Sequence, residues 1–226
     1  VLTDINLNVP ASSVLGVFGR TGAGKSTLLH VLARLYDPPT GTVSVDESDI
    51  NALDRAEWRR RLAVAPQRPF LFSETIADNI ALGTTFDIDA VERAASDAAL
   101  DSDLRVFAEG LETVVGQRGI MLSGGQRQRV ALARALMRNA DLVLLDDVLS
   151  AVDHRTEAQL VSSLRGAGRD RKAPPTVVIV SNRISALRHA DTIVVLDEGR
   201  VVDQGTHSEL ASRDGVYRDV WEVQRT

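Results

Sequence analysis

Residues 19–27 combine glycines with a lysine and hydroxyl side chains, and residues 19–26 have the spacing G-x-x-x-x-G-K-S/T. Glycines let the backbone wrap around an anion without side-chain clashes, and the amides at the start of a following helix favour negative charge. The pattern therefore predicts a phosphate-binding loop, in which Lys25 reaches the β- and γ-phosphates of a nucleotide and the Ser26 hydroxyl ligates Mg²⁺. Its members are Gly19, Arg20, Thr21, Gly22, Ala23, Gly24, Lys25, Ser26 and Thr27.

The flanking residues supply the elements that such a loop needs. Val14–Phe18 is an apolar run with the length of a buried strand, and residues 26–35 have the composition of a helix that Asp37-Pro-Pro then terminates. A strand before the loop and a helix after it are the context that distinguishes a phosphate loop from a chance glycine-rich turn.

Two carboxylates, Asp146 and Asp147, follow the apolar run Leu142–Leu145. The carboxyl ends of strands in a nucleotide-binding sheet face the ligand crevice, so Asp146 is expected near Mg²⁺, through a water molecule. The alternative interpretation is a pair of N-cap aspartates at a strand-to-helix turn.

A second helix start suited to an anion occurs at Leu122-Ser-Gly-Gly-Gln126. Ser123 is a good N-cap, and Gly124 and Gly125 leave the backbone amides open. One triphosphate needs only one such cradle, so we expect the second, Ser123 to Gln126, to serve a nucleotide held by another subunit.

Taken together, these motifs resemble the nucleotide-binding domain of an ATP-binding-cassette (ABC) transporter over essentially the whole chain. Residues 19–27 resemble the Walker A motif, Gln67 the Q-loop glutamine and Leu122–Gln126 the signature. Residues 142–147 resemble Walker B, and Ser150-Ala-Val-Asp153 the D-loop. The resemblance implies ATP and Mg²⁺ as cofactors, metal contacts from Ser26, Gln67 and Asp146, and a nucleotide contact from Asp153. It also implies head-to-tail pairing of two cassettes, each signature completing the other's site.

Two further stretches narrow the resemblance to exporter-type cassettes. Residues 64–80 resemble the segment that follows the Q-loop, and residues 113–119 resemble the loop that touches the coupling helices of the membrane domains. The family usually has Glu where this chain has Gln117. The alternative is that both stretches are ordinary solvated loops.

The hydrolytic positions depart from the family pattern. Asp147 stands where the resemblance implies a catalytic Glu that aligns the attacking water with the γ-phosphate, and Asn182 where it implies a switch-loop His that contacts the γ-phosphate. Asp is shorter by one carbon–carbon bond, roughly 1.5 Å, and a displacement of about 1 Å can cost on the order of 10²-fold in rate. Asn cannot take up a proton. We therefore expect this site to bind ATP–Mg²⁺ but to hydrolyse it slowly. The residues in the hydrolytic roles are Asp147, Asn182 and Gln67.

The expected fold is α/β: a P-loop core with a parallel sheet, a small antiparallel β subdomain and an α-helical subdomain. The whole chain, 1–226, forms one cassette, with the helical part at about 75–137, where Ala-rich sequence has helical spacing. Further strands are expected at Ile5–Val9, Thr42–Val45, Leu62–Ala65, Val177–Val180 and Ile193–Leu196.

Composition excludes several other classes. The net charge of −5 disfavours a nucleic-acid partner, and the lack of cysteine excludes disulfides and thiolate metal sites. His30, His154, His189 and His207 match no metal-ligand spacing, and Trp58 and Trp221 are expected to be packing groups. No apolar run reaches the roughly 18 residues of a membrane span. A transmembrane domain and the adenine-stacking aromatic residue are expected before Val1.

The leading hypothesis is the ATP-hydrolysing engine of an exporter at the cytoplasmic face of the inner membrane. With Asp147 and Asn182 it resembles the degenerate half of a heterodimeric exporter, whose partner is a second nucleotide-binding domain on a different chain. The first alternative is a non-hydrolytic ATP-binding regulatory or assembly module. The second is a soluble ABC ATPase of repair or translation, which the exporter-like stretches disfavour.

Overall fold

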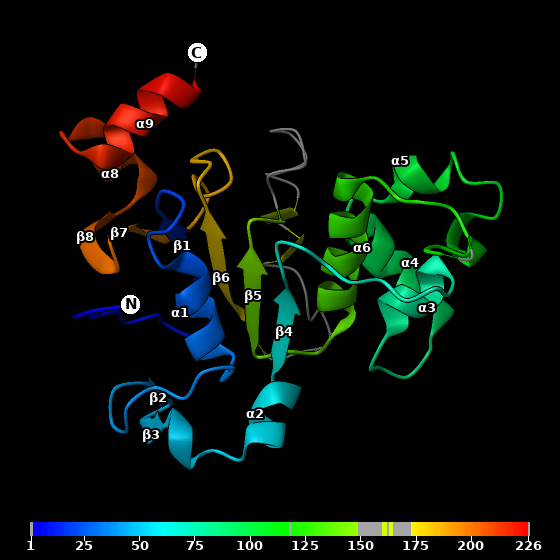
Figure 1. Ribbon diagram of the computed structural model, residues 1–226, viewed down its shortest axis with the longest axis horizontal. Helices are drawn as coiled ribbons and strands as arrows, with labels where there is room; N and C mark the ends of the chain where they lie inside the picture. The colour runs from blue at the N-terminus through cyan, green and yellow to red at the C-terminus, as the bar shows by residue number, and fades with distance from the viewer. Residues whose placement is uncertain (1, 118, 149–159, 162, 165–172, 226) are drawn as a thin grey trace.

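A six-stranded sheet forms the centre of the computed structural model, which describes residues 2–117, 119–148, 160–161, 163–164 and 173–225 (Figure 1). The strand order is β4-β5-β6-β1-β7-β8, parallel except for β8, which pairs antiparallel with β7. The strands are β1 (Val14–Phe18), β4 (Leu62–Ala65), β5 (Leu142–Asp146), β6 (Thr176–Ser181), β7 (Thr192–Asp197) and β8 (Arg200–Gly205). The carboxyl ends of the five parallel strands therefore share one edge.

The strand predictions for the sheet are confirmed because each is a short, continuous apolar run. Val14–Phe18 and Leu62–Ala65 have the predicted bounds, and β5, β6 and β7 contain the predicted runs. Such runs are typical of parallel strands that are covered on both faces.

Two strand predictions are wrong in part or entirely. Residues 5–9 form no strand, although their alternation is real: Ile5, Leu7 and Val9 pack against the core while the asparagines between them are exposed. Of residues 42–45, only β2 (Ser44–Val45) forms a strand, antiparallel to β3 (Ser48–Asp49), and this pair is the small antiparallel sheet. An alternating pattern reports one buried side, whereas a strand also needs a hydrogen-bonded neighbour.

The helix after β1 is shorter than the predicted Ser26–Leu35. It is α1 (Lys25–Leu32), with Ala33 as its C-cap, and it ends because Arg34 adopts a left-handed backbone with φ of 50°. The other described helices lie after the small sheet, between β4 and β5, and after β8. They are α2 (Arg55–Arg60), α3 (Ile76–Ala81), α4 (Ile88–Asp97), α5 (Asp101–Leu104), α6 (Gly124–Met137), α8 (His207–Ser212) and α9 (Val216–Gln224).

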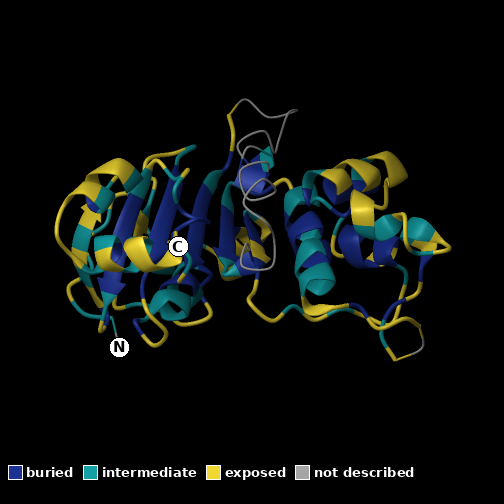
Figure 2. Cartoon of the chain, turned by 90° about the horizontal axis from the view of Figure 1, so that it is seen from above, coloured by how far each residue is buried: buried dark blue, intermediate teal, exposed yellow. Residues whose placement is uncertain are grey.

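The sheet separates two hydrophobic cores, and buried residues follow its strands (Figure 2). On one face, α1 packs with Trp58 against side chains such as Val17 and Leu144. On the other face, α6 and Tyr217 of α9 belong to the core that contains Phe18 and Leu145. Successive residues of a strand thus serve opposite cores.

Helices α3 to α6 gather beside the edge strand β4 (Figure 1). Within the described residues, no helix is both long and apolar enough to cross a bilayer.

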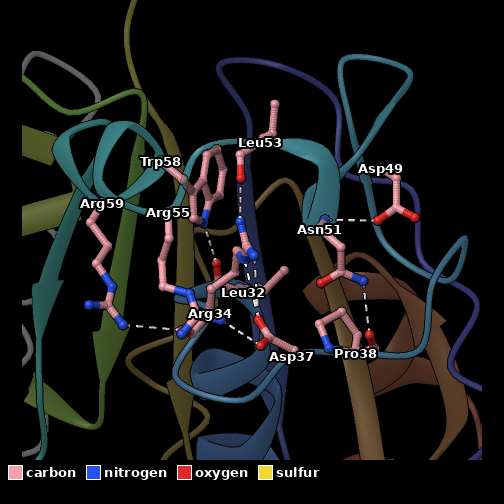
Figure 3. Close-up of polar contacts among 10 residues, drawn as sticks. All are labelled: Leu32, Arg34, Asp37, Pro38, Asp49, Asn51, Leu53, Arg55, Trp58 and Arg59. Carbon is pink, nitrogen blue, oxygen red and sulfur yellow. Dashed lines mark hydrogen bonds and ion pairs between the residues drawn. The ribbon is translucent and has the colours of Figure 1, made fainter.

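A buried arginine joins the end of α1 to the segment around α2 (Figure 3). Arg34 is only 6% exposed; its Nη1 donates to the Leu53 carbonyl at 2.6 Å, and its guanidinium pairs with Asp37 at 3.5 Å. Beside it, the Trp58 indole N–H donates to the Leu32 carbonyl at 2.9 Å. These contacts fix the C-terminal end of the helix that begins at the glycine-rich loop.

We predict that Arg34→Ala lowers the free energy of unfolding by about 2–3 kcal/mol, because it removes the charge-assisted hydrogen bond to the Leu53 carbonyl and the ion pair with Asp37. Denaturant unfolding measures the loss. The control is Arg55→Ala, which removes a half-exposed partner of the same Asp37 and should cost less than about 1 kcal/mol. Equal losses in the two variants would contradict the role assigned to Arg34.

Candidate functional site

The glycine-rich loop, residues 19–24, runs from the end of β1 to the start of α1. A Cβ atom at Gly19 would overlap the carbonyl oxygen of Leu196, so no larger residue fits there without displacing the backbone. Gly24 has φ of 104°, a left-handed conformation, and no side chain caps the helix that starts after it. The first amides of α1 are therefore left for another hydrogen-bond acceptor, as an anion site requires.

Lys25 lies beneath this loop. Its Nζ donates to the carbonyl oxygens of Gly19 at 2.7 Å and Arg20 at 3.0 Å. Burial lowers the pKa of Lys25, and the nearby carboxylates of Asp147 and Asp146 oppose that shift. The ammonium group is thus placed between the loop and the two aspartates.

Ser26 and Asp146 meet at the same end of the sheet. Burial raises the pKa of Asp146, whereas a hydrogen bond from the Ser26 hydroxyl acts in the opposite direction. A hydroxyl beside a carboxylate supplies the hard oxygen donors that Mg²⁺ prefers. This pair therefore fits the metal that the phosphate-loop pattern implies.

The Asp147 carboxylate is contacted by one residue of β6 and by one residue that follows β4, the two strands that flank β5. Its Oδ1 accepts a hydrogen bond from the Ser181 hydroxyl at 2.9 Å, and its Oδ2 lies 3.5 Å from Nε2 of Gln67. Its backbone is left-handed, with φ of 51°, and its N–H donates to the Val180 carbonyl at 2.9 Å. The side chain is thus directed by Gln67, which follows β4, and by the last residue of β6.

Ser181 was not identified from the sequence as a site residue. It is 1% exposed, and its hydroxyl oxygen also accepts from the Arg183 N–H at 3.0 Å. The sequence offered one signal for a role of Ser181 in the site, namely its position between a predicted strand and Asn182. That Ser181 contacts Asp147 follows only from the pairing of Asp146 with Val180 in the sheet. Asn182 is exposed in the loop that follows Ser181.

The second predicted anion cradle lies at the start of α6. Ser123 and Gln126 form a capping box: the Gln126 N–H donates to Ser123 Oγ at 3.2 Å, and the Ser123 N–H donates to Gln126 Oε1 at 2.8 Å. Gly124 and Gly125 occupy the first helical turn. Helix α6 stands among the helices beside β4, whereas α1 packs against β5 and β6 (Figure 1). The capping box and the glycine-rich loop thus lie in different parts of the fold.

The two stretches that resemble exporter-type cassettes, residues 64–80 and 113–119, are joined by backbone hydrogen bonds. The Ile76 N–H donates to the Thr113 carbonyl at 3.0 Å, and the Val115 N–H donates to the Glu74 carbonyl at 3.0 Å. Close by in sequence, Phe70 and Phe72 are 69% and 46% exposed and pack edge to face at 5.1 Å. The first of the two paired stretches therefore exposes two aromatic rings.

Some predicted residues lie outside the described part of the chain, namely residues 150–153 with Asp153, and His154. Within the described ranges, no three histidine, cysteine, aspartate or glutamate side chains form a metal-binding group. Trp58 is 2% exposed and Trp221 packs against the core, which confirms both as packing groups.

Comparisons with known families, sequences and structures all point to ATP-binding-cassette proteins. Residues 2–150 match the family model described as ABC transporter. The chain is 43% identical over 228 residues to the multidrug resistance-like ATP-binding protein MdlA of Escherichia coli K12, covering 99% of this chain and 38% of that protein. It is 41% identical to the mouse mitochondrial ATP-binding cassette sub-family B member 10, covering 99% of this chain and 32% of the relative.

A solved structure, that of a bacterial Atm1-family ABC exporter with ATP bound, superimposes with a TM-score of 0.89 at 38% identity. It covers all of this chain, which spans 39% of that protein. The α/β cassette fold inferred from the sequence is thereby confirmed. Because the family model accounts for well over half of the residues, the chain belongs to the ABC transporter family.

Proposed function

We propose that this chain is the ATP-binding and ATP-hydrolysing domain of an exporter-type transporter. The observation that carries the proposal is the convergence of Lys25, Ser26, Asp146 and Asp147 at one edge of the parallel sheet, next to a helix start without a side-chain cap. The relative from Escherichia coli, which is named as a multidrug resistance-like ATP-binding protein, supports the same assignment. So does the solved structure that is described as an exporter with ATP bound.

Each residue at this edge has a role that follows from its chemistry. Residues 19–27 hold the phosphates, with Lys25 as the cation that leaves the Gly19 and Arg20 carbonyls to reach the triphosphate. Ser26, Asp146 and Gln67 would hold Mg²⁺, which neutralises charge on the phosphates when bound. Gln67 also links this group to Asp147.

The hydrolytic step at this site is slow in the proposed function. The short Asp147 side chain accepts a hydrogen bond from the Ser181 hydroxyl. This hydrogen bond holds the Asp147 carboxylate toward β6. Asn182 offers a hydrogen bond but no ionisable group. Binding of ATP and Mg²⁺ depends on other residues, so it is retained.

The same proposal assigns two partners. Ser123, Gly124, Gly125 and Gln126 complete the ATP site of a second nucleotide-binding domain, on a different chain with an intact hydrolytic pair, and Asp153 contributes to the same interface. The exposed Phe70 and Phe72, together with the loop at 113–119, contact transmembrane domains at the cytoplasmic face of the membrane. This chain spans 32–38% of the curated relatives described above, which leaves room for such domains in the whole protein.

Replacing the phosphate-loop lysine tests nucleotide binding directly. Lys25→Met should weaken MgATP binding by about 30-fold or more, because a charge-assisted contact to the phosphates is lost. Titration of the purified protein with a fluorescent ATP analogue measures the dissociation constant. Arg218→Ala, an exposed substitution on α9, is the control with unchanged affinity. Equal affinities for all three proteins would reject the assigned site.

Restoring the family residues tests whether the site is a slowed engine. In the full transporter, Asp147→Glu with Asn182→His should raise ATP turnover at this site by roughly 10- to 100-fold, since an oriented base is returned to the reacting group. Adding Lys25→Met to the same background should abolish the gain. If the double variant binds ATP but gains no turnover, the regulatory-module alternative replaces the engine.

The signature can be tested in trans. Ser123→Ala in this chain should cost about 1 kcal/mol of stability as a lost N-cap, and it should lower ATP turnover of the assembled heterodimer at least several-fold. Asp87→Ala removes the N-cap of α4 instead, so it controls for a loss of stability alone. Equal turnover in the two variants would reject the trans role of the signature.

A further inference from the structure

The last helix of the chain contacts the loop that carries Asn182. Gln224, in the final turn of α9, uses both ends of its side-chain amide on the backbone of this loop. Its Oε1 accepts from the Ile184 N–H at 2.8 Å, and its Nε2 donates to the Asn182 carbonyl at 2.9 Å. A single side chain, 40 residues later in the sequence, therefore brackets Arg183 from both sides.

The same loop is held from the sheet by Ser181. The Ser181 hydroxyl oxygen accepts from the Arg183 N–H at 3.0 Å while the hydroxyl donates to Asp147. Beyond Ile184, which is fully buried, the Leu187 and Arg188 N–H groups both donate to the Ile184 carbonyl. The backbone of residues 182–184 is thus fixed by one group on the sheet and one on α9.

Helix α9 is a firm support for such a contact. Tyr217 is 1% exposed and packs edge to face on Phe18 with ring centroids 5.3 Å apart; Phe18 immediately precedes the phosphate loop. The Tyr217 hydroxyl is 2.8 Å from Nδ1 of His207, and Trp221 packs edge to face on the same imidazole at 4.9 Å. Residues 217, 221 and 224 share one helix face because they are four and three positions apart.

We propose that Gln224 is a positioning residue: it clamps the backbone of residues 182–184 and thereby places Asn182, and through Ser181 also Asp147, at the γ-phosphate end of the nucleotide site. The proposal rests on the function proposed above, because it assigns the C-terminal helix to that same site. Gln224 itself touches backbone only, so it acts through the loop and not on the nucleotide.

The clamp can be tested in the full protein by hydrogen exchange. Gln224→Leu keeps the side-chain size and removes both hydrogen bonds, so exchange of the Ile184 amide should accelerate by about tenfold, the factor for one net hydrogen bond. Gln224→Glu keeps the acceptor for Ile184 but loses the donor to Asn182, so the Ile184 amide should stay protected. Val223→Ala, at a side chain that is 75% exposed in the same turn, is the matched control. Unchanged exchange in Gln224→Leu overturns the clamp.

Nucleotide affinity then tests the positioning. Because the loop serves the γ-phosphate end, Gln224→Leu should raise the dissociation constant for MgATP several-fold and leave that for MgADP unchanged. Gln224→Glu should show the same selective effect, since the Asn182 carbonyl loses its donor. Equal changes for both nucleotides, or none, would overturn the positioning role and leave the proposed function intact. If the unaltered protein bound no ATP, the proposed function would fail, and the exchange result would still report on the clamp.

Discussion

Parallel pairing of β5, β6 and β1 makes three loops emerge at one edge of the sheet, and everything at the candidate site depends on that register. Asp146 pairs with Val180 and Phe18 with Ser181, so the aspartates, the 181–184 loop and the glycine-rich loop start at the same level. A shift by one residue would exchange the faces of every side chain and place Leu145 where α1 packs. The two apolar cores, one on each face, oppose such a shift.

Much of this arrangement could be predicted from the sequence, for a physical reason. A strand buried on both faces must be apolar throughout, so β1, in which every residue is buried, is visible as an uninterrupted run. The residues between Thr75 and Met137 contain helices, as the Ala-rich spacing indicated. The strand prediction at Ile5–Val9 is wrong because alternation reports which side is buried but not whether a neighbouring strand exists.

Other features could not be predicted without the fold. The Ser181–Asp147 hydrogen bond and the contact of Gln224 with residues 182–184 join groups that are 34 to 42 positions apart. A hydroxyl or an amide side chain carries no pattern that names a distant partner. For α8 the sequence did contain a signal, because Thr206 and Glu209 form a capping box, which is a recognisable helix start. At Arg34 the sequence signal was misleading. The predicted helix includes this charged residue, whereas in the structure Arg34 is buried and its left-handed backbone lies just beyond the end of the helix.

The placement of the aromatic residues has an optical consequence. The chain has only two tryptophans, and the sheet stands between them: Trp58 is sealed against α1, and Trp221 rests on the His207 ring at the opposite core. Their indoles therefore sample separate environments, one closed and one partly open to water. Replacing either indole by phenylalanine would leave a single tryptophan, so that with excitation selective for tryptophan over the two tyrosines, emission from one layer of the domain could be followed without interference from the other.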